Sequence, residues 1–208
     1  MSVPFIFKND ILKGKRALIT GGGSGIGLAI ATRLAMAGAE EAARIAKDHG
    51  VTALGLQVNV RDPESVQQCF VETMRGFGTD HLDILINNAA GNFYFPSHML
   101  SDNQWKAVLE IDLYGTFHCS RAAYPYMKQH GGSIVSITMT LHHTGWVGMM
   151  PACAAKAGID AVTRTLAVEW ARHNIRVNGI APGFVTTEGV LKALYQGRDF
   201  ENTSHIPL

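Results

Sequence analysis

Short apolar runs alternate with helical patterns along most of this 208-residue chain. The runs are aliphatic or β-branched and show no polar alternation, which is typical of strands buried on both faces. Strands that alternate with helices predict a parallel sheet covered by helices, an α/β fold of the doubly wound type. The predicted strands are Arg16–Thr20, Ala53–Val58, Ile84–Asn87, Ser133–Thr138 and Ile175–Ala181, and the predicted helices are Gly25–Ala37, Pro63–Phe77, Asp102–Lys128 and Pro151–Arg172.

The alternation breaks at one place. After Gly38, which we expect to end the first helix, Ala39–Lys47 continues as helix with no strand between. A doubly wound sheet needs a second strand here, with a charged residue at its end to meet an adenosine ribose, and neither is visible. Either the fold has lost this unit or the chain is not the whole natural protein. We favour the second reading: a segment is missing between Glu40 and Glu41, and residues 1–208 otherwise form a single domain.

A glycine-rich turn, Thr20-Gly21-Gly22-Gly23-Ser24-Gly25-Ile26-Gly27, joins the first strand to the first helix. Without a Cβ, glycines let the backbone approach a pyrophosphate closely. The amides at the helix start then face the anion, where the helix dipole favours negative charge. The turn therefore predicts dinucleotide binding by Gly21, Gly23, Ser24, Gly25, Ile26 and Gly27. The glycine spacing differs from the common G-x-G-x-x-G, so an ordinary strand-to-helix turn remains the alternative.

Composition argues against several classes of partner. The formal net charge is +1 and only 17% of the residues are charged, so nucleic-acid binding has no electrostatic support. No apolar run approaches the length of a membrane span, and Met1–Asn9 lacks the features of a signal peptide. Three scattered cysteines predict reduced thiols, a cytoplasmic location and no metal cluster. The pair His142-His143 is interpreted as loop polarity.

Four further segments could carry chemistry. Asn87-Asn88-Ala89-Ala90-Gly91-Asn92-Phe93 follows a strand, at the edge where ligands gather in parallel sheets, although a plain polar turn would look similar. Asp112 lies on the apolar face of its helix, so it must be paired or have a raised pKa, whether it acts as a proton donor or as a structural carboxylate.

Lys156 has small neighbours in its helix, but a surface lysine is the simpler alternative. Pro182-Gly183 by itself is only a turn signal. Ser101 and Gln104 have the spacing of a capping box.

Together these segments resemble the short-chain dehydrogenase/reductase family, whose Rossmann-like fold begins with a T-G-x-x-x-G-x-G turn. The resemblance implies that Lys156 binds the nicotinamide ribose and that the backbone of Asn88, Ala89, Ala90, Pro182, Gly183 and Val185 contacts the cofactor. Asn59 stands where the family has an aspartate that meets adenine. The family's catalytic tyrosine and serine fall on Ala152 and Met139, so proton transfer from a phenol to a carbonyl is not available here.

Within that family the chain is most similar to the 2,4-dienoyl-CoA reductases, in particular their peroxisomal branch, which also lacks the tyrosine and has aspartate at the position of Asp112. The resemblance implies NADPH, with NADH not excluded, and an acyl-CoA substrate. Asn92 would bond the thioester carbonyl, and Arg61, Phe93 and Ser101 would line the acyl-CoA site, with Asp112, Lys156 and Asn92 as the catalytic set.

The same resemblance implies a homotetramer formed through the two long helices. It also implies a final strand and helix beyond Leu208, and a peroxisomal location if the natural C-terminus carries a targeting signal. Two other functions stay open: reduction of another substrate such as a 3-oxoacyl thioester, and nucleotide binding without catalysis.

Overall fold

The protein is described from a computed structural model that covers residues 7, 8, 10–41 and 52–189. Its strands form one parallel sheet in the order β2-β1-β3-β4-β5. The strands are β1 (Arg16–Ile19), β2 (Glu40–Glu41), β3 (Ile84–Asn87), β4 (Gly132–Ile137) and β5 (Ile175–Ile180). The Rossmann-like fold predicted from the alternating pattern is therefore confirmed.

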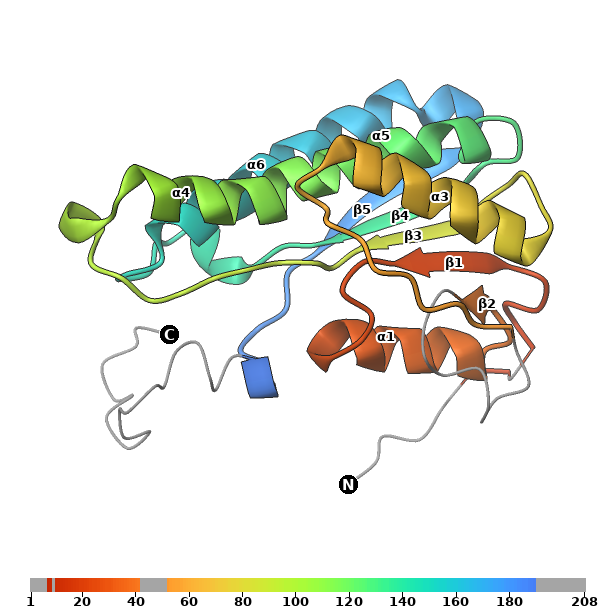
Figure 1. The fold of residues 1–208 in the computed structure, drawn as a ribbon, viewed down its shortest axis with the longest axis horizontal. Helices are drawn as coiled ribbons and strands as arrows, with labels where there is room; N and C mark the ends of the chain where they lie inside the picture. Colours follow the sequence, from red (N-terminus) through yellow and green to blue (C-terminus); the bar gives the residue numbers. More distant parts are fainter. Residues whose placement is uncertain (1–6, 9, 42–51, 190–208) are drawn as a thin grey trace.

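The sheet separates two layers of unequal size (Figure 1). Helix α1 (Gly25–Met36) covers one face, and α3 (Pro63–Phe77), α5 (Gly115–Met127) and α6 (Met150–Glu169) cover the other. Helix α4 (Asp102–Leu109) lies on the side of α5 and α6, beyond the carboxyl ends of the strands. Alternate residues of β1 point to opposite faces of the sheet and pack into two hydrophobic clusters. Leu18 belongs to the large cluster beneath α3 and α5, whereas Ala17 and Ile19 pack toward α1. This two-sided burial explains why the strands read as continuous apolar runs. No helix in the described ranges combines the length and the apolar character that a membrane span requires.

The second strand is present, contrary to expectation, but it is minimal. Glu40 and Glu41 pair in parallel with Arg16 and Ala17, so β2 borders only the first half of β1. Its last residue is acidic, although the sequence was not expected to offer a charged residue there. The helical pattern predicted to continue to Lys47 lies outside the described residues from position 42 onward, as does the region from Val190 to Leu208.

The prediction of a strand at Ala53–Val58 is wrong. Only Ala53 makes an isolated bridge, and the segment that follows is irregular. A strand needs a neighbour of matching length, and the two residues of β2 do not provide one. Instead, residues 55–58 border a cavity of about 410 Å³ beside the carboxyl end of β1.

The long helix predicted over Asp102–Lys128 is continuous but changes type in the middle. The capping box of Ser101 and Gln104 begins α4 as predicted. A π-helical segment, η2 (Glu110–Tyr114), then connects α4 to α5. Such segments insert one residue into a helix and are frequent at functional sites. Short 3₁₀ helices lie at η1 (Ser97–Met99), η3 (Thr140–His142) and η4 (Ala171–His173).

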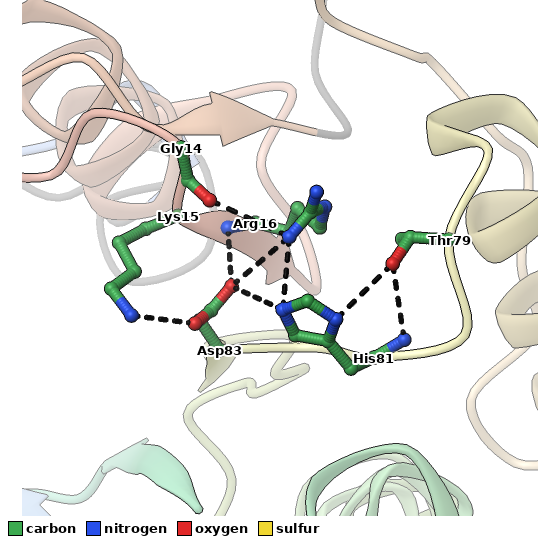
Figure 2. A network of polar contacts seen from close by, with 6 residues as sticks. All are labelled: Gly14, Lys15, Arg16, Thr79, His81 and Asp83. Atoms are coloured by element: carbon green, nitrogen blue, oxygen red, sulfur yellow. Dashed lines mark hydrogen bonds and ion pairs between the residues drawn. The ribbon is translucent and has the colours of Figure 1, made fainter. Parts of the chain in front are cut away.

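At the amino ends of β1 and β3, Asp83 joins the two strands (Figure 2). One carboxylate oxygen accepts a bond of 3.0 Å from the backbone amide of Arg16, and the other accepts 2.9 Å from Lys15 Nζ. The His81 side chain lies close to both Arg16 and Asp83: its Nε2 is 2.9 Å from the Arg16 guanidinium and 3.6 Å from the Asp83 carboxylate. The side chain of Asp83 is only 13% exposed, so its partners are not readily replaced by water.

We expect Asp83→Ala to lower the free energy of unfolding by about 1–3 kcal/mol, because it leaves a half-buried amide and a cation without their acceptor. Lys15→Ala removes only an exposed ion pair and should cost at most about 1 kcal/mol. Urea denaturation of the two variants measures both values. Equal losses would show that Asp83 does not anchor β1 to β3.

Candidate functional site

A buried ion pair lies at the carboxyl ends of the central strands. Asp112 is 1% exposed, and its Oδ2 lies 3.3 Å from Lys156 Nζ. Its Oδ1 accepts a 2.8 Å hydrogen bond from the amide of Gly91, and Lys156 Nζ donates at 2.8 Å to the carbonyl of Ile137. The loop after β3, the π segment, the end of β4 and helix α6 therefore converge on one pair of charges.

Burial dominates the electrostatics of this pair. Removal from water raises the pKa of Asp112 above its ordinary value of 3.8, and the opposing effects of the Lys156 charge and of the hydrogen bonds from Gly91 and Lys156 only reduce that shift. The sequence predicts that this carboxylate is either paired or has a raised pKa. In the structure Asp112 is paired with Lys156, and its pKa is raised as well. Asp112 therefore keeps its proton to a higher pH than an exposed aspartate does.

The glycine turn leaves part of its backbone uncovered. Gly21 and Gly25 adopt positive φ angles of 66° and 53°, and a Cβ on Gly27 would collide with the Gly21 carbonyl. By contrast, a Cβ on Gly23 would meet nothing within 4 Å. Ser24 begins α1 without a side-chain cap, and no acidic residue lies in the first turn. The first amides of α1, which include that of Ile26, therefore remain available to an anion.

The cavity beside the turn extends the same surface. It is lined by Gly21–Gly23, by residues 55–58 and by apolar side chains including Leu18, Val66 and Phe70. Its volume of about 410 Å³ is within the range of small-molecule sites. A turn that exposes amides, next to an apolar cavity, fits a dinucleotide with its pyrophosphate at the turn and a ring system in the cavity.

A hydrogen-bonded clamp joins the glycine turn to the segment after β3. The hydroxyl of Thr20 accepts bonds from the amides of Asn88 and Ala89, at 3.0 and 2.9 Å. The Asn88 side chain donates in return to the carbonyls of Thr20 and Gly21. Asn88 thus braces the turn, while Ala90 stays exposed beyond it.

The next residues form a wall against the loop that precedes α6. Asn92 Nδ2 lies 3.2 Å from Met149 Sδ, and Asn92 Oδ1 accepts from the amide of Phe93. The amide of Phe95 donates to the carbonyl of Gly148 at 3.0 Å. Sulfur is a weak acceptor, so the Asn92 side-chain amide retains the capacity to bond a stronger oxygen acceptor.

The residues implied for the far parts of the site have partners of their own. Arg61 is paired with Glu110 at the start of the π segment, with Nε 2.9 Å from the carboxylate. Asn59 is exposed, and its side-chain oxygen accepts from the amide of Arg61. Ser101 is exposed too, with its hydroxyl in the capping box. Arg61 and Asn59 therefore lie near the start of the π segment, whereas Ser101 lies at the start of α4. Among the described residues, no hydrogen bond or ion pair joins these three to Asp112.

The segment after β5 returns to the glycine turn. Pro182, Gly183 and Val185 follow the carboxyl end of the strand, and a Cβ on Gly25 would lie 3.5 Å from the Thr187 methyl group. On the other side of the site, Ala152 is 2% exposed in the first turn of α6, so no phenol occupies that position.

The comparisons decide the family. A family model described as short chain dehydrogenase matches residues 15–196. The chain belongs to the short-chain dehydrogenase family. It is therefore an oxidoreductase of the short-chain dehydrogenase type.

Among curated relatives of this family, the rat peroxisomal 2,4-dienoyl-CoA reductase is 44% identical over 200 residues, which cover 89% of this chain and 68% of the relative. The Arabidopsis thaliana protein of the same name is 39% identical over 225 residues, covering 97% and 75%.

Solved structures agree with this assignment. A citronellol catabolism dehydrogenase from Pseudomonas aeruginosa has a TM-score of 0.78 at 31% identity, covering 86% of this chain and 78% of its own. A short chain dehydrogenase from Mycobacterium smegmatis has a TM-score of 0.79 at 27% identity, covering 89% and 83%.

Several groups of this short-chain dehydrogenase site have no signal in the sequence. The amide of Gly91 and the carbonyl of Ile137 are backbone atoms, which any residue would supply. Glu110 could have been suggested only by its place two residues before Asp112. The prediction that His142 is a polar loop residue is wrong, because its side chain is 3% exposed and lies against Asp160 of α6.

We expect Asp112→Asn to change the pH dependence of stability in a defined direction. A carboxyl whose pKa is raised in the folded state contributes stability that is complete below 3.8 and is lost as the pH rises through the folded-state pKa. The free energy of unfolding of the wild type should therefore fall, relative to that of the variant, as the pH rises from about 4. Urea denaturation of both proteins between about pH 3.5 and 7 measures this difference. A difference that grows in the opposite direction would mean that Lys156 outweighs desolvation.

Proposed function

We propose that this short-chain dehydrogenase reduces 2,4-dienoyl-CoA thioesters with NADPH. The observation that carries the proposal is the buried pair of Asp112 and Lys156 at the carboxyl ends of β3 and β4, in a site where Ala152 replaces a phenolic proton donor. A reaction that places negative charge on an oxygen, and later protonates a carbon, suits a site of this kind. The names of the relatives at about 40% identity support the same substrate class.

The nicotinamide cofactor would lie along the carboxyl edge of the sheet. Gly21, Gly23, Ser24, Gly25, Ile26 and Gly27 would hold the pyrophosphate, and Asn59 would meet the adenine. Asn88, Ala89, Ala90, Pro182, Gly183 and Val185 would supply backbone contacts toward the nicotinamide. When bound, NADPH supplies the hydride. Lys156 would orient the ribose, because its ammonium group is held in place by the carbonyl of Ile137 and the carboxylate of Asp112.

The substrate would lie between the loop after β3 and the loop before α6. Phe93 would offer an aromatic surface there, and Ser101 and Arg61 would lie along the CoA moiety. Hydride addition to the far end of the conjugated system moves charge onto the thioester oxygen. The side-chain amide of Asn92 would donate to that oxygen, and a donor aimed at a developing charge lowers the barrier.

Asp112 would complete the reaction as the proton source. Its raised pKa lets the carboxyl hold a proton nearer to neutral pH than an ordinary aspartate, which a general acid requires. The proton would pass to a carbon of the dienolate, directly or through an ordered water, to give a 3-enoyl thioester. The adjacent ammonium group of Lys156 stabilises the carboxylate that remains.

Two further properties are proposed with this function. The faces of the long helices, 102–128 and 150–169, would form a homotetramer. The location would be peroxisomal, which is the location in the names of the relatives, and a cytoplasmic enzyme is the alternative.

We also propose that the natural protein carries additional residues after Glu40. The alignment with the Arabidopsis relative runs over 225 residues, although this chain has only 208, so it includes positions that the chain lacks. This supports a missing segment. Such a segment would lengthen β2 and allow residues 53–58 to pair with it.

The proposed activity is tested by following NADPH absorbance with a 2,4-dienoyl-CoA, and in parallel with a 3-oxoacyl-CoA and with NADH. We expect turnover with the dienoyl thioester and NADPH. Turnover of the 3-oxoacyl thioester alone would assign a carbonyl reductase. NADPH binding without turnover of either thioester would assign a nucleotide-binding protein without catalysis.

Asp112→Ala separates catalysis from cofactor binding. We expect a fall in kcat of about 10²–10⁴-fold, which is typical for loss of a general acid, with NADPH affinity changed less than about threefold. Stopped-flow turnover and fluorescence titration of NADPH measure the two quantities, and Glu169→Ala on the exposed end of α6 is the control. Equal losses in turnover and affinity would make Asp112 a structural residue.

A further inference from the structure

We propose that His142, His143 and Asp160 form a binding site for a divalent transition-metal ion, with zinc as its probe. One ligand atom from each of these residues lies within 4.8 Å of the others. His142 Nε2 is 2.7 Å, and His143 Nε2 4.0 Å, from Asp160 Oδ2. The site is independent of the proposed reaction, because it uses none of the residues assigned to cofactor or substrate.

The tautomer of His142 is the first argument. Its Nδ1 approaches the carbonyl oxygen of Met139, which can only accept, so Nδ1 carries the proton. This tautomer directs the lone pair of Nε2 toward Asp160 whenever Nε2 carries no proton. A backbone carbonyl that holds the opposite ring nitrogen in this way is the usual second-shell partner of a metal-binding histidine.

The second argument is that Nε2 of His142 has no hydrogen-bond partner. The His142 side chain is 3% exposed, and Nε2 has no hydrogen-bond partner although the Asp160 carboxylate is 2.7 Å away. An imidazole nitrogen without a proton and a carboxylate oxygen are both acceptors, so a proton or a metal ion must lie between them. Because this pair does not form a hydrogen bond, a metal ion suits the arrangement. In a tetrahedral site a nitrogen lone pair points at the metal and not at the neighbouring ligand, so two ligand atoms lie close together without a hydrogen bond between them.

The spacing fits such an ion. Ligand atoms about 2.0–2.2 Å from a tetrahedral zinc lie about 3.4 Å apart. The two separations from Asp160, 2.7 and 4.0 Å, fall on either side of that value. The rings of His142 and His143 are 3.9 Å apart between centroids, so the exposed His143 needs only a small movement to join the site. Two imidazoles and one carboxylate suit zinc and leave a position for water.

Folding, and not spacing in the sequence, creates the cluster. The histidines end the 3₁₀ helix η3 in the loop before α6, and Asp160 lies one helical turn after Lys156. The scattered histidines and cysteines predict no metal cluster because Asp160 is 17 positions away from its nearest partner. A bound ion would tie the loop that contains Met149, and hence the wall opposite Asn92, to the helix that carries Lys156.

A second group of similar composition provides the control. Asp80, His81 and His130 also bring their ligand atoms within 4.8 Å. Both nitrogens of His81 are already engaged there, Nε2 with Arg16 at 2.9 Å and Nδ1 with Thr79 at 3.2 Å (Figure 2). That group therefore has no buried nitrogen without a partner, and we expect it not to bind zinc comparably.

The test is isothermal titration of the chelator-treated, dialysed protein with zinc chloride at pH 7. We expect one zinc per chain, and affinity at least about tenfold weaker in His142→Ala and Asp160→Asn. His130→Ala should bind as the wild type does. Zinc should also raise the Tm of the wild type and of His130→Ala, but not that of His142→Ala. Equal affinity in the wild type and His142→Ala, or loss of binding only in His130→Ala, would overturn the proposal.

His143→Ala guards against misfolding of the buried variants, because the His143 side chain is 73% exposed and its removal leaves the core intact. We expect it to weaken zinc binding while the Tm without metal stays at the wild-type value. Cobalt gives a second readout: visible d–d absorption bands of tetrahedral cobalt should appear in the wild type and be weaker in His143→Ala. Identical cobalt spectra and zinc affinities in these two proteins would exclude His143 and overturn the three-residue site.

Discussion

The arrangement of the site depends on the burial of one carboxylate, that of Asp112. An isolated charge at 1% exposure would cost many kcal/mol, so the structure must provide partners or keep the group protonated. It does both: the Gly91 amide and the Lys156 ammonium surround the carboxyl, and its pKa is still raised. Breaking such a pair is far more costly than its net contribution to stability. The four segments that meet there are therefore held in a fixed relation.

The topology of the sheet decides which segments can meet in this way. All strands run parallel, so the glycine turn after β1, the loop after β3 and the end of β4 emerge at the same edge. Helix α6 then returns its first turns to that edge and brings Lys156 to Ile137. The amino ends of β1 and β3 are joined instead by the polar network around Asp83. The amino ends of the strands are thus stabilised by a largely buried carboxylate with charged partners, and the carboxyl ends hold the candidate site.

Much of this could be predicted from the sequence, because parallel strands buried on both faces leave a clear pattern. Four strands and the helices were placed within a few residues, and the position of Asp112 on an apolar face correctly indicated an unusual carboxylate. The prediction at Ala53–Val58 failed because apolar character alone does not supply a pairing edge. The π segment was not predicted, because it is a single turn inside a longer helix and the apolar pattern of the sequence continues through it. The contact of His142 with Asp160 was also beyond reach, because it depends on how the loop before α6 folds back.

The bonds between Thr20 and Asn88 have a mechanical consequence. The Thr20 hydroxyl accepts two amides from the neighbouring segment, and Asn88 donates to the carbonyls of Thr20 and Gly21. These reciprocal bonds hold the glycine turn after β1 and the loop after β3 in a fixed relative position. Under the proposed function, one loop would hold the pyrophosphate and the other would lead to Asn92 at the thioester. The protein itself would then fix the distance between the hydride donor and the thioester substrate. Binding energy of the cofactor or the substrate would not be needed to bring the two together.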